Sequence, residues 1–188
     1  MTNKTHHTRG RRDTAAVAEE LTRENSPVSP VVTALRRQTA NAFVLYANDK
    51  HYHWQTFGPL FRDLHKLFDK FATAILESAD ELAERVRMIG QDPPATLAEM
   101  LELASVASTA GHATMREMVE EARNNALIVI EEMRAAAREA DAHDDPGTVD
   151  LWSRLVQVHE KQEWWLRDIL RRGDGLYGGA SADTARNM

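Results

Sequence analysis

Residues 58–90 read GPLFRDLHKLFDKFATAILESADELAERVRMIG, and Pro93-Pro94 follows them. Apolar side chains recur in this segment at steps of three and four, the period of a helix face that packs on a core. Gly58-Pro59 favours a helix start, and Gly90 favours a helix end. The segment therefore predicts one long amphipathic helix. Its apolar stripe, expected to face the subunit's own core, comprises Phe61, Leu64, Phe68, Phe71, Ile75, Ala79, Leu82, Val86 and Ile89.

A second line on the same helix carries side chains that can bind a metal ion. His65 and Asp69 are four residues apart, and so are Asp80 and Glu84, which places each pair a turn apart on one face. Fifteen residues separate one pair from the other, so at ~1.5 Å per residue the pairs lie roughly 22 Å apart along a helix. A single helix therefore cannot bring all four side chains to one ion.

The two pairs are symmetric about position 74–75. Two copies of the helix that cross antiparallel at this position would bring the His65 pair of one chain to the Glu84 pair of the other. A two-fold dimer would then contain two identical sites across its interface. His53 can join each site from the preceding helix, because the Gly58-Pro59 corner folds that helix back along the next one.

These donor types narrow the choice of metal and of site. Imidazole and carboxylate without thiolate suit Fe(II), Mn(II) or Zn(II). The internal di-iron site of many helical bundles uses Glu-x-x-His pairs. None of the eight histidines has Glu three positions before it, which argues against an internal site and favours the interface site. Five side chains shared by two ions leave positions open for water or an oxidant, as a site that oxidises and releases metal requires.

Three further long helices and one short helix are predicted around this segment. Apolar side chains in helical phase, with the positions of proline and glycine, indicate their boundaries. The expected helices are 30–56, 94–106 (the short one), 112–142 and 148–172, with Asp144-Asp145-Pro146-Gly147 as a turn and another short helix over 14–23. Four long helices joined mostly by short connections make an all-α four-helix bundle. We expect a polar N-terminal tail over 1–29, one bundle domain over 30–172 and a loose C-terminal tail over 173–188.

The composition is typical of a globular domain that folds in water, with 43% hydrophobic and 28% charged residues among 188. The absence of cysteine excludes disulfides, thiolate metal sites and thiol catalysis. No apolar run approaches the ~20 residues of a membrane span, and the first residues lack the apolar stretch of a signal peptide, so we expect a cytoplasmic protein. A net charge of −6 argues against general nucleic-acid binding by the globular surface.

The ligand pattern resembles that of the Dps family, the DNA-binding proteins from starved cells, which are miniferritins. The resemblance rests on His53-x11-His65-x3-Asp69-x10-Asp80-x3-Glu84 with Trp54 after the first histidine, and it covers about residues 30–172. It implies a ferritin-like bundle assembled as a hollow homo-dodecamer with ferroxidase sites at two-fold interfaces. It also implies oxidation of Fe(II), preferably by hydrogen peroxide and with oxygen as the other candidate oxidant, and storage of ferric oxyhydroxide, which protects DNA from oxidative damage. Zinc is expected as a competitor at the same ligands.

Other residues have candidate roles that stand beside simpler interpretations. Trp54 fits an electron donor or radical quencher next to the site, and equally a packing residue at a helix end. Asp144, Asp145 and Asp150 fit an acidic pore that draws Fe(II) inward, or an ordinary acidic loop in which Asp150 favours a helix N-terminus. His159 lies in the apolar phase of its helix, so we expect a hydrogen-bonded core or interface histidine rather than a ligand.

The first twelve residues contain Lys4, Arg9, Arg11 and Arg12 and no acid. Repeated on each subunit, these cations could hold DNA by phosphate contacts, with an affinity that falls steeply with salt. Acids at positions 19, 20 and 24 weaken this interpretation. Two alternatives to an iron-storing enzyme therefore stay open. One is a nucleoid-binding structural protein that acts through this tail, and the other is a helical scaffold that binds zinc.

Overall fold

The computed structural model describes residues 28–111 and 114–171. Within these ranges the chain forms helices and no strands, which confirms the predicted all-α fold. The helices are α2 (Pro30–Gln55), α3 (Phe61–Met88), α4 (Leu97–Leu103), α5 (Met115–Ala142) and α6 (Pro146–Leu170). The helix predicted over 14–23 lies outside the described residues.

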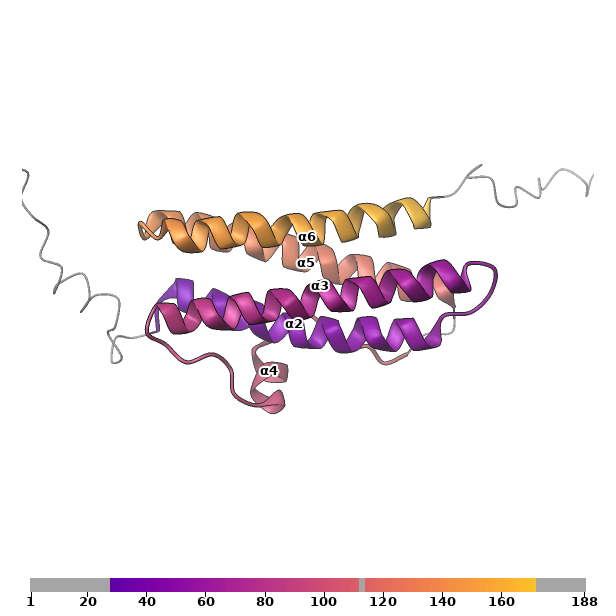
Figure 1. Cartoon of the computed structure of the whole chain (residues 1–188), viewed down its shortest axis with the longest axis horizontal. Helices are drawn as coiled ribbons and strands as arrows, with labels where there is room; N and C mark the ends of the chain where they lie inside the picture. The colour runs from indigo at the N-terminus through magenta and orange to yellow at the C-terminus, as the bar shows by residue number, and fades with distance from the viewer. Residues whose placement is uncertain (1–27, 112–113, 172–188) are drawn as a thin grey trace, which may run out of the picture.

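The four long helices form two antiparallel pairs that pack together as a bundle (Figure 1). Helix α2 packs mainly on α3, and α5 packs mainly on α6. Helix α4 lies beside α2, in the long connection that crosses from the first pair to the second (Figure 1). None of the described helices is both long enough and apolar enough to cross a membrane.

Two clusters of buried apolar side chains fill the bundle, one towards each end. The first includes Leu35, Leu82, Val86 and Trp152, and the second includes Tyr52, Phe68, Met118 and Leu166. All eight of these side chains are at most 1% exposed. Most of the apolar stripe predicted on α3 lies in these clusters, because each of its turns presents an apolar side chain to the inside.

Two asparagines of α2 hold the connection between α4 and α5. Asn41 Oδ1 accepts a hydrogen bond from the backbone N–H of Ser105 at 2.8 Å, and Asn41 Nδ2 donates to Ser105 Oγ at 2.9 Å. Two turns later, Asn48 Nδ2 donates to the carbonyl oxygen of Ala107 and Asn48 Oδ1 accepts from the N–H of Thr109, both at 2.9 Å. Residues 105–109 therefore lie along α2 without a regular element of their own.

Side-chain caps are present at the starts of α2, α4, α5 and α6, and one predicted boundary is wrong. Residues 144–147 do not form a turn throughout, because α6 already begins at Pro146. Asp145 is the N-cap and accepts a hydrogen bond from the N–H of Thr148 at 3.0 Å. Proline suits the first helical position, since its missing N–H has no partner there. The other predicted ranges extend a few residues beyond the observed helices, because apolar periodicity alone does not locate the residue at which a helix begins or ends.

Arg85 joins the end of α3 to the start of α6. Arg85 Nη2 lies 2.6 Å from Asp145 Oδ1, and Arg85 Nε donates to Thr148 Oγ1 at 2.8 Å. Gly147 leaves room for the guanidinium group, since a Cβ at this position would lie 3.0 Å from Arg85 Nη2. Burial works to raise the pKa of Asp145, but the hydrogen bonds from Thr148 and the charge of Arg85 outweigh it and lower that pKa.

Replacing Asp145 by alanine should destabilise the bundle by about 1–3 kcal/mol, because α6 loses its N-cap and Arg85 loses its carboxylate. The lowered pKa means that this stabilisation is fully present above the ordinary Asp value of 3.8 and is lost as the pH falls through the folded-state value. Denaturant unfolding at fixed protein concentration, at neutral and at acid pH, measures the difference. Asp141→Ala, an exposed acid at the same corner, is the control and should change stability little. An equal loss in both variants would contradict the assigned role of Asp145.

Candidate metal centre

His53 and His65 lie face to face where α2 ends and α3 begins. Their ring centroids are 3.6 Å apart, and their planes are inclined by 19°. The chain turns between the two helices at Gly58, whose φ of +81° is a conformation that glycine adopts without strain. The predicted corner at Gly58-Pro59 is therefore present, and it brings together two imidazoles from different helices.

Each of these histidines is hydrogen-bonded to the backbone of the other. His53 Nδ1 lies 2.6 Å from the carbonyl oxygen of His65, and His65 Nδ1 lies 2.8 Å from the carbonyl oxygen of His53. A carbonyl oxygen can only accept, so each Nδ1 carries the hydrogen and donates it. Each Nε2 of a neutral ring then keeps its lone pair, which is the form in which imidazole binds a metal. The two rings are thus oriented as ligands by the fold itself.

Phe61 covers the other face of His65. The two ring centroids are 5.2 Å apart, with planes inclined by 24°, so the three rings form one stack. Phe61 is 47% exposed, and the prediction that it faces the core with the rest of the α3 stripe is wrong. It occupies the first position of α3, where the helix has not yet reached the bundle interior, and it packs on the histidine one turn later.

Asp69 lies one turn after His65 and is paired with a lysine of α2. Lys50 Nζ lies 2.7 Å from Asp69 Oδ1. The hydrogen bond and charge of Lys50, with a smaller contribution from the two histidines, lower the pKa of the Asp69 carboxyl group. Asp69 therefore stays ionised as pH falls below the usual Asp range, and a metal ion that uses this oxygen has to displace the ammonium group.

Asp80 and Glu84 lie on the same side of α3, towards its other end, and both are exposed. The neighbouring Glu81 is different, because its carboxylate is held 2.7 Å from Arg154 Nη1 of α6. Among residues 28–111 and 114–171, no three His, Asp or Glu side chains lie close enough to hold one metal ion. Within one subunit, the predicted ligands thus fall into a histidine half and an acidic half.

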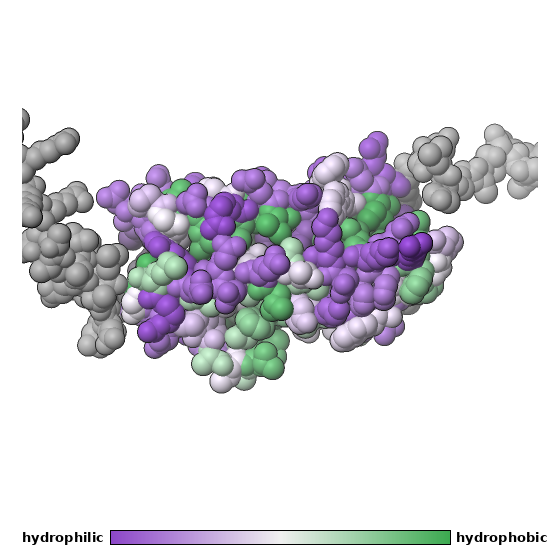
Figure 2. Space-filling view, viewed as in Figure 1, coloured by the Kyte–Doolittle hydropathy of each residue, from purple (hydrophilic) through white to green (hydrophobic). Residues whose placement is uncertain are grey.

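The surface between the two halves is partly apolar. Ala72 is buried and Leu76 is 42% exposed, and both line a groove along α3 that Tyr46 and Lys50 border on the α2 side. Helix α4 presents Leu97 and Leu101, which are 71% and 61% exposed, and Figure 2 shows the resulting apolar patch among polar side chains. These features leave an uncovered apolar surface around the ligand line.

The three acids predicted near the start of α6 are in different states. Asp144 is exposed and has a positive φ of 53° in the turn that ends α5. Both carboxylate oxygens of Asp145 are used inside the subunit, by Arg85 and Thr148. Asp150 is exposed and lies 3.2 Å from Arg154 Nε. The pore role stays a prediction for all three acids, and only Asp145 already has both carboxylate oxygens engaged by side chains of its own subunit.

The remaining predicted residues divide between the corner and the tail. Trp54 is 67% exposed beside His53, so it does not pack inside its own subunit. His159 is 3% exposed, which confirms its place in the core, but its Nδ1 has no hydrogen-bond partner in the part of the chain that the structure describes. Lys4, Arg9, Arg11 and Arg12 lie outside the described residues.

Two features of the site were not found from the sequence. Lys50 was not connected with Asp69, although it lies one turn before His53 and so on the same face of α2. The hydrogen bonds between the ring of each histidine and the backbone carbonyl of the other were not predicted either, because the sequence does not show which backbone oxygens accept a hydrogen bond. A search for cations one turn away from each ligand would have found Lys50.

Comparisons with known proteins place this geometry in a family. The model of a ferritin-like domain matches residues 32–176. A DNA protection during starvation protein from Brevibacillus brevis is 38% identical over 140 residues, which is 74% of this chain and 94% of that relative. The solved structure of Dps from Thermosynechococcus elongatus shares 46% identity with a TM-score of 0.77, over 79% of this chain and 94% of that one.

A third relative is described by the chemistry of its superfamily. The crystal structure of a Dps protein from Vibrio cholerae, presented as a member of a broad superfamily of ferritin-like diiron-carboxylate proteins, shares 28% identity with a TM-score of 0.72. It covers 75% of this chain, and the match spans 89% of that protein. On the match to the family model and on these relatives, this chain belongs to the ferritin-like family and, within it, to the Dps proteins.

Proposed function

We propose that two subunits complete each other's metal sites across a two-fold axis that passes α3 at position 74–75. His53, His65 and Asp69 of one subunit would then face Asp80 and Glu84 of the partner subunit. The observation that carries this proposal is the division of the ligands between the two ends of α3. Two oriented imidazoles lie at its start, and towards its other end lie exposed carboxylates with no ion-pair partner among the residues that the structure describes. The apolar surface around Leu76 supplies area for the contact.

The assembly that follows is a hollow homo-dodecamer, as the Dps resemblance implies, with these dimers as its two-fold contacts. A closed shell is consistent with the exposed apolar side chains of α4, which a neighbouring subunit would cover. The acids at Asp144 and Asp150 would lie near a pore and raise the local concentration of Fe(II).

The reaction is oxidation of Fe(II), preferably by hydrogen peroxide, followed by storage of ferric oxyhydroxide inside the shell. Neutral imidazole and carboxylate ligands suit Fe(II), and their small number leaves room for the oxidant. Each ferrous ion gives up one electron, so a pair of them reduces one peroxide molecule to water without releasing a hydroxyl radical. Removal of both Fenton reactants would protect DNA. Zn(II) suits the same donors and would compete for them.

Lys50 and Trp54 have supporting roles in this proposal. Lys50 keeps Asp69 ionised and in place before iron arrives. Trp54 lies next to His53, where an exposed indole can deliver an electron to the site or quench a radical formed there. Neither side chain is needed to bind the metal itself.

Asp80→Ala and Glu84→Ala should each slow peroxide-driven Fe(II) oxidation by at least about 10–100-fold, because each site loses one of its few ligands. Stopped-flow absorbance of the ferric product measures the initial rate, and native mass confirms that the assembly persists. Glu81→Ala is the matched control, since this acid pairs with Arg154 and should leave the rate near that of the parent. Parent-like rates in both ligand variants would show that the site is elsewhere.

Mixed assemblies extend this test to the sharing between subunits. Chains with His65→Ala lack the histidine half, and chains with Glu84→Ala lack the acidic half. In a mixed dimer, one of the two sites is intact and the other lacks both groups, so random mixing should restore about a quarter of the parent activity. No recovery on co-refolding, despite mixed assemblies by native mass, would refute a site shared by two subunits.

Lys50→Met should tighten metal binding about two- to fivefold, since the metal no longer has to break the exposed ion pair between Lys50 and Asp69. Anaerobic calorimetric titration with Co(II), which does not oxidise during the measurement, gives the dissociation constant. Lys66→Met removes the same charge from an exposed position of α3 and serves as the control. Equal changes in both variants would assign the effect to net charge rather than to the contact with Asp69.

DNA binding through the basic tail is the second candidate function, and it is favoured by the four cations that precede the first acid. Gel shifts over a salt series should show binding by the full chain that weakens steeply as salt rises. A chain that starts at Val28, and so lacks Lys4, Arg9, Arg11 and Arg12, should bind far more weakly. Equal binding by the two chains at every salt concentration would show that the tail does not contribute to DNA binding.

A further inference from the structure

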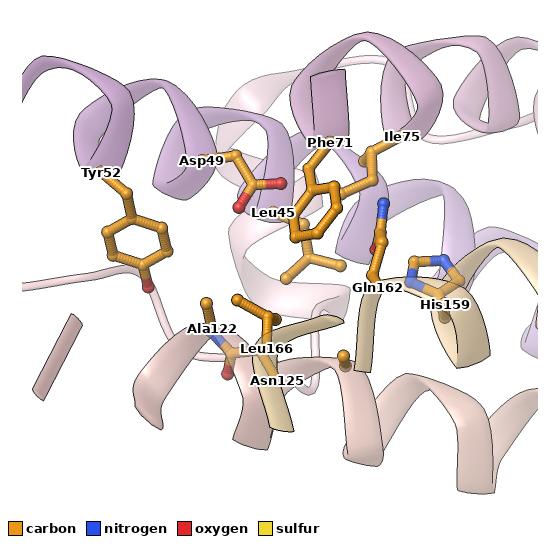
Figure 3. Close-up of a pocket in the computed structure, with 11 residues that line it drawn as sticks. Leu45, Asp49, Tyr52, Phe71, Ile75, Ala122, Asn125, His159, Gln162 and Leu166 are labelled. Atoms are coloured by element: carbon orange, nitrogen blue, oxygen red, sulfur yellow. The ribbon is translucent and has the colours of Figure 1, made fainter. Parts of the chain in front are cut away.

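A small cavity lies at the centre of the bundle, between the two apolar clusters. All four long helices contribute to its wall, with Asp49 from α2, Phe71 from α3, Asn125 from α5 and both His159 and Gln162 from α6 (Figure 3). Its volume is about 10 Å³, which is close to the smallest space that holds one water molecule.

Several polar atoms at this cavity have no hydrogen-bond partner among the described residues. They are Asn125 Nδ2, His159 Nδ1 and Gln162 Nε2. Each of these three residues is at most 5% exposed, so bulk water does not reach them. Buried amide donors in folded proteins nearly always find an acceptor, either from the protein or from an ordered water molecule.

Asp49 supplies an acceptor of the right kind on the facing helix. The residue is 5% exposed, and its carboxyl group extends from α2 towards the interior (Figure 3). Burial raises the pKa of Asp49, and burial lowers the pKa of His159 to about 4, so both shifts favour the uncharged form of the group. The polar centre of the bundle therefore suits a neutral occupant.

We propose that the centre of the bundle is a hydration site, in which an ordered water molecule joins the Asp49 carboxyl group to the unpartnered amides of Asn125 and Gln162. A water molecule accepts two hydrogen bonds and donates two, so it can receive an amide N–H and donate to Asp49 or to His159 Nδ1. This molecule links α2, α5 and α6 at the level where the apolar packing is interrupted.

The chemistry of the wall suits water better than a metal ion. Bundles with an internal di-iron site place carboxylates and Glu-x-x-His pairs at this position. Here the wall offers a single carboxyl group and a single imidazole. Its other polar groups are the neutral amides of Asn125 and Gln162 and the phenol of Tyr52, which donates to Glu121. Phe71 and Ile75 make the α3 side apolar. A divalent ion would therefore find too few donors to replace its own water shell.

Crystals of the full assembled chain, measured before and after a soak with Co(II), test the proposal. We expect density for a water molecule within hydrogen-bond distance of Asp49 and of at least one amide. We also expect no anomalous cobalt signal in the cavity. An empty cavity, direct bonds between rotated amides and Asp49, or a cobalt peak among these residues would each overturn the proposal.

The melting temperature of an Asn125→Leu variant is a second test of the proposal. If water satisfies this amide, its loss leaves Asp49 and the water with fewer partners, and the melting temperature of the assembly should fall by about 2–8 °C. A dry cavity predicts the opposite, because the substitution would delete an unpaired donor and fill empty space. Asn124→Leu, an exposed neighbour on the same helix, is the matched control. A melting temperature that stays level with this control or rises above it would overturn the proposal.

Discussion

Helix α3 has to bury one side against its own bundle and keep a second side open, and most of the subunit is arranged around this requirement. Its inner side enters both apolar clusters through Phe68, Leu82 and Val86. Its outer side carries acids and a histidine at the two ends and small or apolar side chains between them. Each end is also held by a neighbour, through the His53–His65 pair at the start and through Arg85 at the finish. The two halves of the proposed site therefore sit at the two best anchored parts of the helix.

The charges near the ligands show how such a site can be both ready and stable before metal binds. Lys50 satisfies Asp69, so the carboxylate does not stand beside the two imidazoles without a counter-charge. The pair is partly exposed, and contacts of this kind are weak enough for a divalent ion to displace. Glu81 and Asp150 share Arg154 on the adjacent surface, which separates acids with a structural partner from Asp80 and Glu84. At this end of α3, pairing within the subunit thus distinguishes Glu81 from the ligand candidates Asp80 and Glu84.

The polar groups at the centre of the subunit differ in kind from those on its outer face. The centre keeps a single carboxyl group among neutral amides and apolar walls, a combination that favours water over a cation. The outer face carries exposed carboxylates and partly exposed imidazoles. In the proposed site, iron chemistry would take place on this outer face, and the bundle interior would serve only to hold the helices together.

The sequence by itself determined the helical bundle, the short helix in its long connection and the spacing of the ligand candidates along α3. These depend on periodicity and on proline, glycine and capping residues, which act over a few positions. It did not predict the ion pairs of Lys50 with Asp69 and of Arg85 with Asp145. It also did not predict that Phe61 packs on the ring of His65 instead of facing the core. It placed His159 in the apolar phase of its helix, but it did not show that His159 shares a cavity with Asp49 and Asn125. Only the tertiary structure decided these contacts, because they join helices distant in the chain and depend on the rotation and height at which those helices pack.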